Sequence, residues 1–173
     1  MSIPRYNVLF LCTGNSARSI MAEALIEFWG RGRFAGFSAG SQPRGEVNPL
    51  ALETLSALRV PIADARSKDW SEFAAADAPE MNFVFTVCDD AAGEQCPVWP
   101  GQPITAHWGI ADPASVEGTE VEKTLAFRRA FAELERRIKI FVSLPIAAMD
   151  RLQLQTRLDA IATGADDAVN ESA

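Results

Sequence analysis

Cysteine, histidine and positive charge are all scarce in this sequence. Of its 173 residues, three are cysteines and one is a histidine, and 16 Lys and Arg stand against 23 Asp and Glu, a formal net charge of −7. A small, odd number of cysteines fits a disulfide framework poorly, and one histidine without Cys-x2-Cys spacing argues against a zinc site. The negative charge argues against a nucleic-acid partner, because that affinity depends on clustered Lys and Arg.

Long hydrophobic runs are also missing. No stretch of 18 apolar residues occurs, and residues 1–6 lead into a strand-like segment without a signal-peptide pattern. We therefore expect no membrane partner and a cytoplasmic location, where cysteines are reduced and are free, catalytic or redox-active. With 48% apolar and 23% charged residues, the chain has the balance of one globular domain.

Short β-rich segments alternate with helix-like segments along most of the chain. Strands are predicted at residues 6–11, 34–38, 82–87 and 104–108, and helices at 17–30, 48–58, 71–76 and 120–142. Strands that alternate with helices are typical of a parallel sheet. The predicted fold class is therefore α/β, a single domain with a four-stranded parallel sheet flanked by helices.

The pattern weakens after Pro145. We assign residues 1–144 to the domain and residues 145–173 to a C-terminal extension. In that extension a helix is predicted at 149–161, followed by an acidic, small-residue-rich end that we expect to be mobile.

Cys12 and Arg18 form a Cys-x5-Arg pattern between a predicted strand and a predicted helix. The spacing alone is weak evidence, but a strand, a tight loop and a helix N-terminus in this order suit a tetrahedral oxyanion. Backbone N–H groups and the Arg18 guanidinium would hold its oxygens, and they would stabilise a Cys12 thiolate. The alternative is a buried core cysteine at a strand end. The predicted oxyanion-binding residues are Thr13, Gly14, Asn15, Ser16, Ala17, Arg18 and Ser19.

Several motifs in order carry a resemblance to a known family. The run NVLFLCTGNSARSIMAE at residues 7–23 is followed by Ser38-Ala-Gly, Asn48-Pro and Asp112-Pro. This set resembles the low-molecular-weight tyrosine phosphatase superfamily, and within it the arsenate reductases, over about residues 6–144. The resemblance implies reduction of arsenate to arsenite at Cys12, with arsenate or a phosphate-like oxyanion as the substrate and no bound cofactor. Ala17 stands where these loops often carry another cysteine.

The resemblance also implies a role for Asp112 as the general acid that protonates the leaving oxygen. By sequence alone, an ordinary Asp-Pro turn is the simpler interpretation. Phosphatases of this family usually carry tyrosines just after this motif to hold an aromatic substrate, whereas Ala114 and Ser115 stand here. A platform for phosphotyrosine is therefore missing from the sequence.

Two further cysteines separate a reductase from a phosphatase. Cys88 ends a predicted strand, and Cys96 follows eight positions later. Arsenate reduction needs two electrons, which a second thiol can supply by attacking the first, whereas hydrolysis needs no such pair. The resemblance implies that Cys88 attacks Cys12 and that Cys96 then attacks Cys88, with thioredoxin or glutathione and glutaredoxin as the external thiol reductant. The simpler alternative is two unrelated buried cysteines.

Rival functions are a phosphatase that hydrolyses phosphomonoesters through a cysteinyl-phosphate, and a redox sensor or anion-binding protein without turnover. His107 is interpreted as structural rather than catalytic. Some members of the family bind potassium near the loop, and Asn15, Glu23, Ser38 and Asp69 match that site loosely. Because Glu23 is equally compatible with a solvated helix position, we predict no metal ligand.

Overall fold

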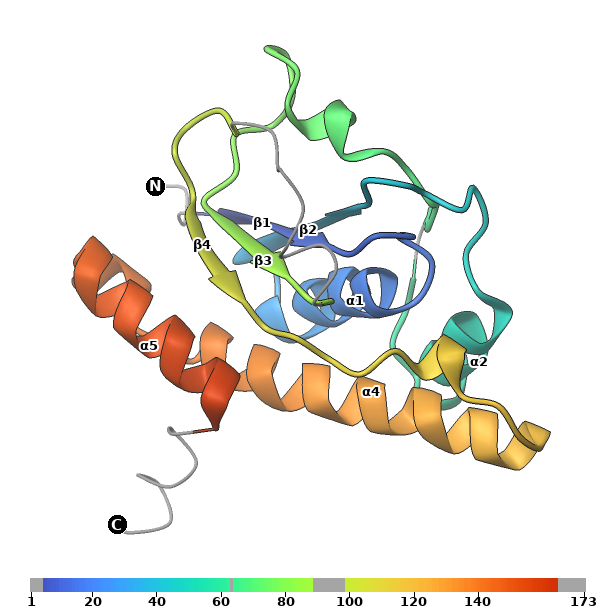
Figure 1. Cartoon of the computed structure of the whole chain (residues 1–173). Helices are drawn as coiled ribbons and strands as arrows, with labels where there is room; N and C mark the ends of the chain where they lie inside the picture. The colour runs from blue at the N-terminus through green and yellow to red at the C-terminus, as the bar shows by residue number, and fades with distance from the viewer. Residues whose placement is uncertain (1–4, 63, 89–98, 165–173) are drawn as a thin grey trace, which may run out of the picture.

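The computed structural model describes residues 5–62, 64–88 and 99–164. In these ranges the chain forms the predicted α/β domain, with four parallel strands in the order β2-β1-β3-β4 (Figure 1). Cys96 and the residues beyond 164 lie outside the described ranges, so what was predicted for them stays a prediction. The strands are β1 (Tyr6–Leu11), β2 (Phe34–Ala39), β3 (Phe83–Thr86) and β4 (Ile104–His107).

The register of the sheet aligns the carboxyl ends of all four strands. Leu11 at the end of β1 pairs with Ala39 of β2 and with Thr86 of β3, and Thr86 pairs with His107 of β4. Ligands of open parallel sheets bind at this edge. The loop that leaves β1 at Cys12 therefore begins at the centre of the expected binding edge.

Helices and 3-10 turns surround the sheet. One sheet face is covered by α1 and α4, and α2 packs against both of these helices (Figure 1). The opposite face is covered by a smaller apolar cluster that includes Phe73, Met81 and Trp99. The segment predicted as a helix at 71–76 is a single 3-10 turn, Trp70–Phe73, in which the Asp69 side chain accepts a hydrogen bond from the Ser71 amide. The helices are α1 (Arg18–Gly30), α2 (Pro49–Ala57), α4 (Glu120–Val142) and α5 (Arg151–Thr163).

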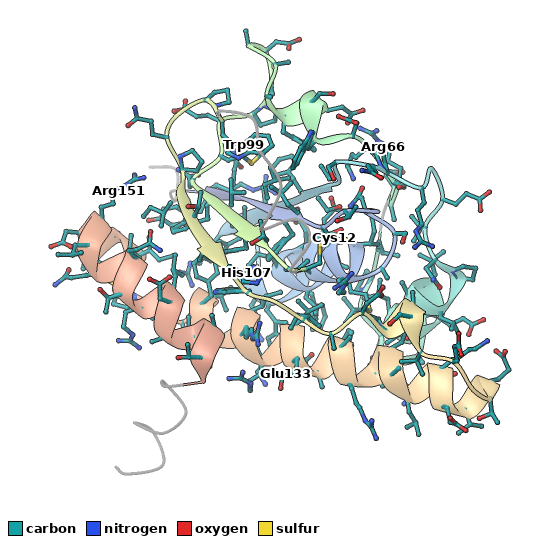
Figure 2. All side chains as sticks on the ribbon, viewed as in Figure 1. Cys12, Arg66, Trp99, His107, Glu133 and Arg151 are labelled. Carbon is teal, nitrogen blue, oxygen red and sulfur yellow. The ribbon has the colours of Figure 1, made fainter. Side chains whose placement is uncertain are left out.

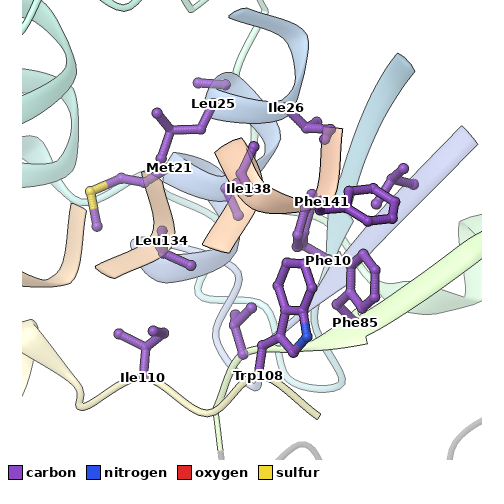
Figure 3. Packing of buried hydrophobic residues seen from close by; sticks show 14 of the residues in the cluster. Phe10, Met21, Leu25, Ile26, Phe85, Trp108, Ile110, Leu134, Ile138 and Phe141 are labelled. Carbon is purple, nitrogen blue, oxygen red and sulfur yellow. The ribbon is translucent and has the colours of Figure 1, made fainter. Parts of the chain in front are cut away.

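Aromatic side chains fill the core between the sheet and α4 (Figure 3). Phe85 of β3 and Trp108 just after β4 stack with ring centroids 4.0 Å apart, and Phe141 of α4 meets both rings edge-on. The five residues predicted to form the apolar stripe of α4 are all buried. They are Phe127, Phe131, Leu134, Ile138 and Phe141.

The last described helix, α5, packs on the same core. Leu154, Leu158 and Ile161 are buried, and the indole N–H of Trp108 donates a hydrogen bond of 3.1 Å to the Leu158 carbonyl. Asp150 caps the helix start, so the helix begins two residues later than predicted. The domain boundary after residue 144 stays a prediction. The hydrogen bond between Trp108 and Leu158 joins α5 to the residue that follows β4. None of the described helices combines the length and apolar character needed to cross a bilayer.

The packing of α5 predicts a difference between two leucines of that helix. Leu158→Ala should lower the free energy of unfolding by about 2–5 kcal/mol, because the Leu158 side chain is fully buried and its removal leaves a cavity in the core. Leu152→Ala is the control, since the Leu152 side chain is 77% exposed and its loss should cost less than about 0.5 kcal/mol. Urea denaturation measures both variants. Equal effects would show that α5 is not part of the cooperative core.

Candidate active site

The loop of residues 12–17 joins β1 to α1, as predicted, and leaves the start of α1 open. Among the described residues no side chain caps the first amides of α1, and its first turn carries no acidic residue. Uncapped N–H groups and the positive end of the helix dipole both favour an anion. The loop is therefore built to receive a ligand rather than to close on itself.

The carbonyl oxygens of the loop are held from outside. They accept hydrogen bonds from the segment that follows β2 and from a serine that precedes Lys68. Because these carbonyls are bonded outward, the N–H groups of the same peptides are available on the inner side. The bonds are Gln42 N to Thr13 O at 3.0 Å, Arg44 N to Gly14 O at 3.0 Å, Ser67 Oγ to Gly14 O at 3.1 Å and Asn48 N to Ser16 O at 2.8 Å.

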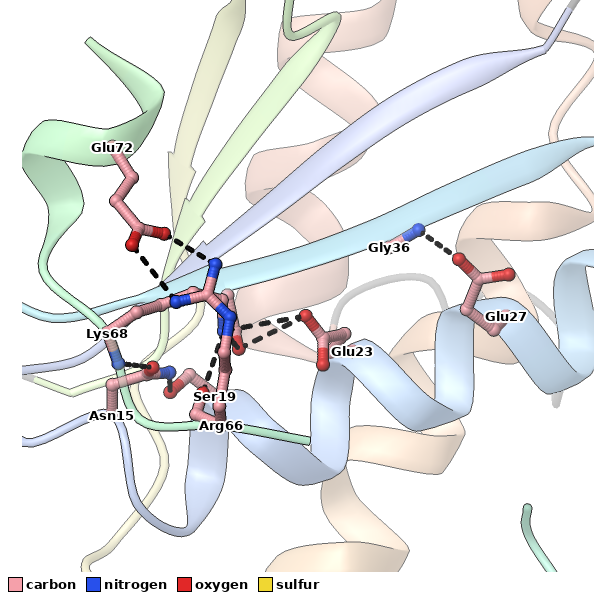
Figure 4. Close-up of polar contacts among 9 residues, drawn as sticks. Asn15, Ser19, Glu23, Glu27, Gly36, Arg66, Lys68 and Glu72 are labelled. Carbon is pink, nitrogen blue, oxygen red and sulfur yellow. Dashed lines mark hydrogen bonds and ion pairs between the residues drawn. The ribbon is translucent and has the colours of Figure 1, made fainter. Parts of the chain in front are cut away.

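Asn15 occupies the most constrained position of the loop. Its φ of +43° lies in the left-handed region, which is costly for a residue other than glycine. The buried side chain offsets this cost with two hydrogen bonds of 2.8 Å, one donated to Ser19 Oγ and one accepted from the backbone N–H of Lys68 (Figure 4). Gly40 packs so closely that a Cβ there would lie 2.7 Å from the Cys12 carbonyl oxygen.

A cavity of about 360 Å³ opens above this loop. Cys12 lies at its base, at the carboxyl end of β1, with only 5% of its surface exposed (Figure 2). Asn15 and Ser19 do not line the cavity but brace the loop from behind. The lining residues are Cys12, Thr13, Gly14, Ser16, Ala17, Arg18, Gln42, Arg44, Asp112 and Ala114.

Gln42 and Arg44 were not predicted from the sequence. Their side chains reach the cavity because their backbone amides bond to the loop, and the Arg44 side chain lies over Gly14. No local pattern marks such a contact between separate segments. A glycine at position 14 leaves the space that the Arg44 stem occupies.

Arg18 faces the cavity from the first turn of α1 and is 13% exposed at its side chain. One terminal nitrogen donates a 2.8 Å hydrogen bond to the Ile110 carbonyl, and the other lies 3.8 Å from the Asp112 carboxylate. Its Nε–H is buried without a hydrogen-bond partner in the described part of the chain. An oxyanion oxygen would supply the missing acceptor.

Asp112 enters the cavity from the loop after β4. Its carboxylate accepts a 2.9 Å hydrogen bond from the Ala114 amide, which orients the side chain, and the side chain is 37% exposed. The structure thus brings Asp112 into one cavity with Cys12 and Arg18, residues separated from it by more than 90 positions. Its role as general acid stays a prediction.

Cys88 lies directly behind the loop and is buried. Its sulfur accepts a hydrogen bond of 3.3 Å from the Thr13 amide. A hydrogen bond from the Cys88 thiol is the main cause that lowers the pKa of Cys12 to about 5, against the opposing effect of burial. Arg18, the Ser19 hydroxyl and the Asn15 backbone lower it further. At pH 7 a thiol with this pKa is about 99% ionised.

The other candidates lie apart from the cavity. His107 Nδ1 is 2.8 Å from the Thr86 hydroxyl at the end of the sheet and does not line the cavity. In the ranges described, no group of three or more His, Cys, Asp or Glu side chains could hold a metal ion. Glu23 and Ser38 do come together, but the Asp69 carboxylate instead accepts from the Ser71 amide. Cys96 lies outside the described residues.

The amino-acid sequence matches a known protein family. The sequence model of the low molecular weight phosphotyrosine protein phosphatases matches residues 7–155. The chain belongs to this family. The resemblance inferred from the Cys12 loop is thereby confirmed, and the match runs past Leu144 into α5.

Members of the phosphatase family that are similar to this chain include arsenate reductases. The arsenate reductase of Shouchella clausii is 37% identical over 134 residues, which cover 78% of this chain and 93% of that protein. The crystal structure of an arsenate reductase from Archaeoglobus fulgidus has a TM-score of 0.62 at 29% identity, covering 79% of this chain and 99% of the other. A thioredoxin-dependent arsenate reductase of Corynebacterium glutamicum has a TM-score of 0.54 at 28% identity, covering 82% and 65%.

The electrostatics of the phosphatase-family loop predict how Cys12 reacts. The rate of Cys12 alkylation by iodoacetamide should rise through a midpoint near pH 5 and stay flat above it, because only the thiolate reacts. Cys88→Ala, which removes the main hydrogen-bond donor, should move the midpoint to higher pH. Cys88→Ser is the matched control, because its hydroxyl retains a donor. Mass spectrometry of the Cys12 peptide gives the rates, and a wild-type midpoint near pH 8.5 would refute the assignment.

Proposed function

We propose that this protein reduces arsenate to arsenite, with Cys12 as the nucleophile and Cys88 as the second thiol. One observation carries the proposal: the Cys88 sulfur accepts a hydrogen bond from the Thr13 amide of the oxyanion loop, beside the Cys12 thiolate. Hydrolysis of a phosphate ester needs no second thiol, because any hydrogen-bond donor in that position could keep Cys12 ionised. Transfer of two electrons to arsenic requires one.

The first step forms a bond between sulfur and arsenic. The loop N–H groups and Arg18 hold the arsenate oxygens, and the Cys12 thiolate attacks the arsenic atom. Asp112 gives its proton to a hydroxyl group of the arsenate, which leaves as water. Arsenic is still pentavalent in the resulting Cys12–arsenic adduct.

The second step is the reduction. The Cys88 sulfur attacks the Cys12 sulfur, a disulfide forms, and the electron pair of the sulfur–arsenic bond stays on arsenic. Arsenic becomes trivalent and leaves as arsenite, which takes up the proton that Cys88 loses. Because Cys88 is a neighbour of Cys12 before substrate arrives, this step needs no large movement of β3.

The last step restores Cys12. Cys96 attacks the Cys88 sulfur, which frees Cys12 as a thiolate and leaves a Cys88–Cys96 disulfide for an external thiol reductant to reduce. Thioredoxin, or glutathione with glutaredoxin, is the proposed donor; the similar Corynebacterium enzyme is thioredoxin-dependent. These reductants work in the cytoplasm, where we place the protein.

Two rival functions are supported less well. Among the described residues that line the cavity none is aromatic, and Ala114 stands at its rim, so a phosphotyrosine ring would find no stacking partner. An anion-binding protein without turnover would have no use for an acid facing the nucleophile, yet Asp112 shares the cavity with Cys12. Slow hydrolysis of small phosphate esters remains compatible with the same residues.

Reduction and hydrolysis should separate in one variant. Cys88→Ser should bring arsenite release to background while p-nitrophenyl phosphate hydrolysis persists within about threefold, because Cys12, Arg18 and Asp112 remain. Cys12→Ser is the control and should abolish both activities. Arsenite release is measured with thioredoxin and its reductase in one arm, and with glutathione and glutaredoxin in the other. Sustained arsenite release by Cys88→Ser in either arm would exclude Cys88 as the second thiol.

A further inference from the structure

A buried arginine interrupts the apolar face of α4. Arg137 lies between Leu134 and Ile138, which are fully buried in the core, and only 8% of its own surface is exposed. Burial lowers the pKa of Arg137, Glu133 opposes this shift and Arg136 adds to it. Charged side chains are almost never buried to this extent unless they are paired. The guanidinium must therefore find its partners inside the protein.

The partners of Arg137 are a carbonyl and a carboxylate. One terminal nitrogen donates a hydrogen bond of 3.2 Å to the Gly109 carbonyl, and the other lies 3.6 Å from the Glu133 carboxylate. The Glu133 side chain is 51% exposed and also accepts from Arg136 at 3.2 Å, so water screens its attraction and a second cation shares it. The bond to Gly109 reaches beyond α4, to a segment that leads to the cavity.

Stability alone does not explain an arginine at position 137. Its Nε–H is buried without a hydrogen-bond partner in the part of the chain that the structure describes, and an unpaired buried donor lowers stability. An apolar side chain of similar length would fill the same space without that loss, and such replacements of buried charges are often neutral or stabilising. The orientation of the Gly109 carbonyl is what this arginine adds.

The Gly109 carbonyl belongs to the stretch of residues 108–112, which carries Asp112 into the cavity. These residues follow the end of β4 and lie beyond the last pair of the sheet. Bonds outside the sheet ladder must therefore fix their backbone. Two amides of the stretch are bonded to the chain that leads to Cys88: Trp108 N donates to Thr86 O at 2.7 Å, and Ile110 N donates to Val87 O at 2.9 Å.

Two arginines hold successive carbonyls of the same stretch. Arg137 of α4 holds the Gly109 carbonyl, and Arg18 of α1 holds the Ile110 carbonyl at 2.8 Å. A peptide group is planar and rigid, so the Gly109 carbonyl and the Ile110 amide can only move together. Loss of the Arg137 bond would let this peptide rotate and would displace the next carbonyl, on which Arg18 depends. Asp112 follows two residues later, 3.8 Å from the Arg18 guanidinium.

We propose that Arg137 is a positioning residue for the active site. By holding the peptide that follows Gly109, it keeps Arg18 oriented toward the bound oxyanion and Asp112 oriented toward the leaving oxygen. The part of this proposal that concerns Arg18 needs only oxyanion binding. The part that concerns Asp112 rests on the proposed function.

Arg137→Met tests the part that concerns Arg18. Inorganic phosphate should protect Cys12 from iodoacetamide at pH 7, and its apparent dissociation constant should be about tenfold higher in the variant, the equivalent of weakening one hydrogen bond to a charged group. Glu133→Gln is the matched control, because it removes the charge beside Arg137 and leaves the bond to Gly109; its constant should equal that of the wild type. An unchanged constant in folded Arg137→Met would overturn the proposal.

Arg137→Lys separates positioning from a general loss of stability. An ammonium can still donate to one carbonyl, so this variant should bind phosphate within about threefold of the wild type. Thermal unfolding of both variants gives their stability, and positioning predicts that phosphate affinity follows the retained donor rather than the melting temperature. Equal losses of affinity in the two variants would overturn the proposal. If Arg137→Met does not fold, Arg137→Gln, which is neutral and too short by two bonds, replaces it with the same expectation.

Two phosphate esters test the part that concerns Asp112. Phenyl phosphate needs a proton on its leaving oxygen more than p-nitrophenyl phosphate does, and the ratio of their kcat/KM values cancels a shared loss of oxyanion affinity. The ratio of p-nitrophenyl to phenyl phosphate should rise at least threefold in Arg137→Met and further in Asp112→Asn. A rise in Asp112→Asn alone would overturn this part for Arg137. No rise in Asp112→Asn would instead contradict the acid of the proposed function, while the phosphate constants would still decide the role of Arg137 toward Arg18.

Discussion

The orientation of the peptide groups between Cys12 and Arg18 is the constraint on which the rest of the site depends. Their carbonyl oxygens are bonded outward to residues 42, 44, 48 and 67, which leaves the amides facing the cavity. This orientation requires Asn15 to adopt a positive φ, and the buried hydrogen bonds of its side chain hold it there. A chain of net charge −7 can thus present a local anion site, because the donors are fixed before the ligand arrives.

Cys88 links that geometry to redox chemistry. As a hydrogen-bond donor it helps to keep Cys12 ionised, and in the proposed function it is also the thiol that attacks the Cys12 sulfur once arsenic is bound. The same contact therefore serves both the nucleophile and the reduction that follows. A phosphatase of this fold needs the first effect, and any other donor could supply it. A reductase needs both.

Local sequence patterns predicted the features that depend on near neighbours. The strand, loop and helix around Cys12 follow from hydrophobic periodicity and turn residues, and the buried stripe of α4 follows from helical spacing. Asp112 and Cys88 could be assigned to the site only through the family resemblance, since nothing local to either residue points to Cys12.

Features made by distant segments were not predicted. Glu23 fitted a solvated helix position equally well until Lys68, 45 positions away, was found beside it. Arg44 and Gln42 reach the cavity through backbone bonds to the loop, and α5 joins the core through the indole of Trp108. Each of these contacts depends on how segments far apart in the sequence pack together. The local sequence of each segment therefore does not predict the contact.

The central claim is that Cys12 and Cys88 together deliver two electrons to arsenic. It is tested most directly by a single turnover of Cys96→Ser with arsenate, without any external reductant, followed by quantification of arsenite and peptide mapping under non-reducing conditions. About one arsenite per protein molecule and a disulfide between Cys12 and Cys88 are expected, because no third thiol can move the disulfide onward. Arsenite released without that disulfide, or no arsenite although Cys12 and Cys88 are both reduced at the start, would contradict it.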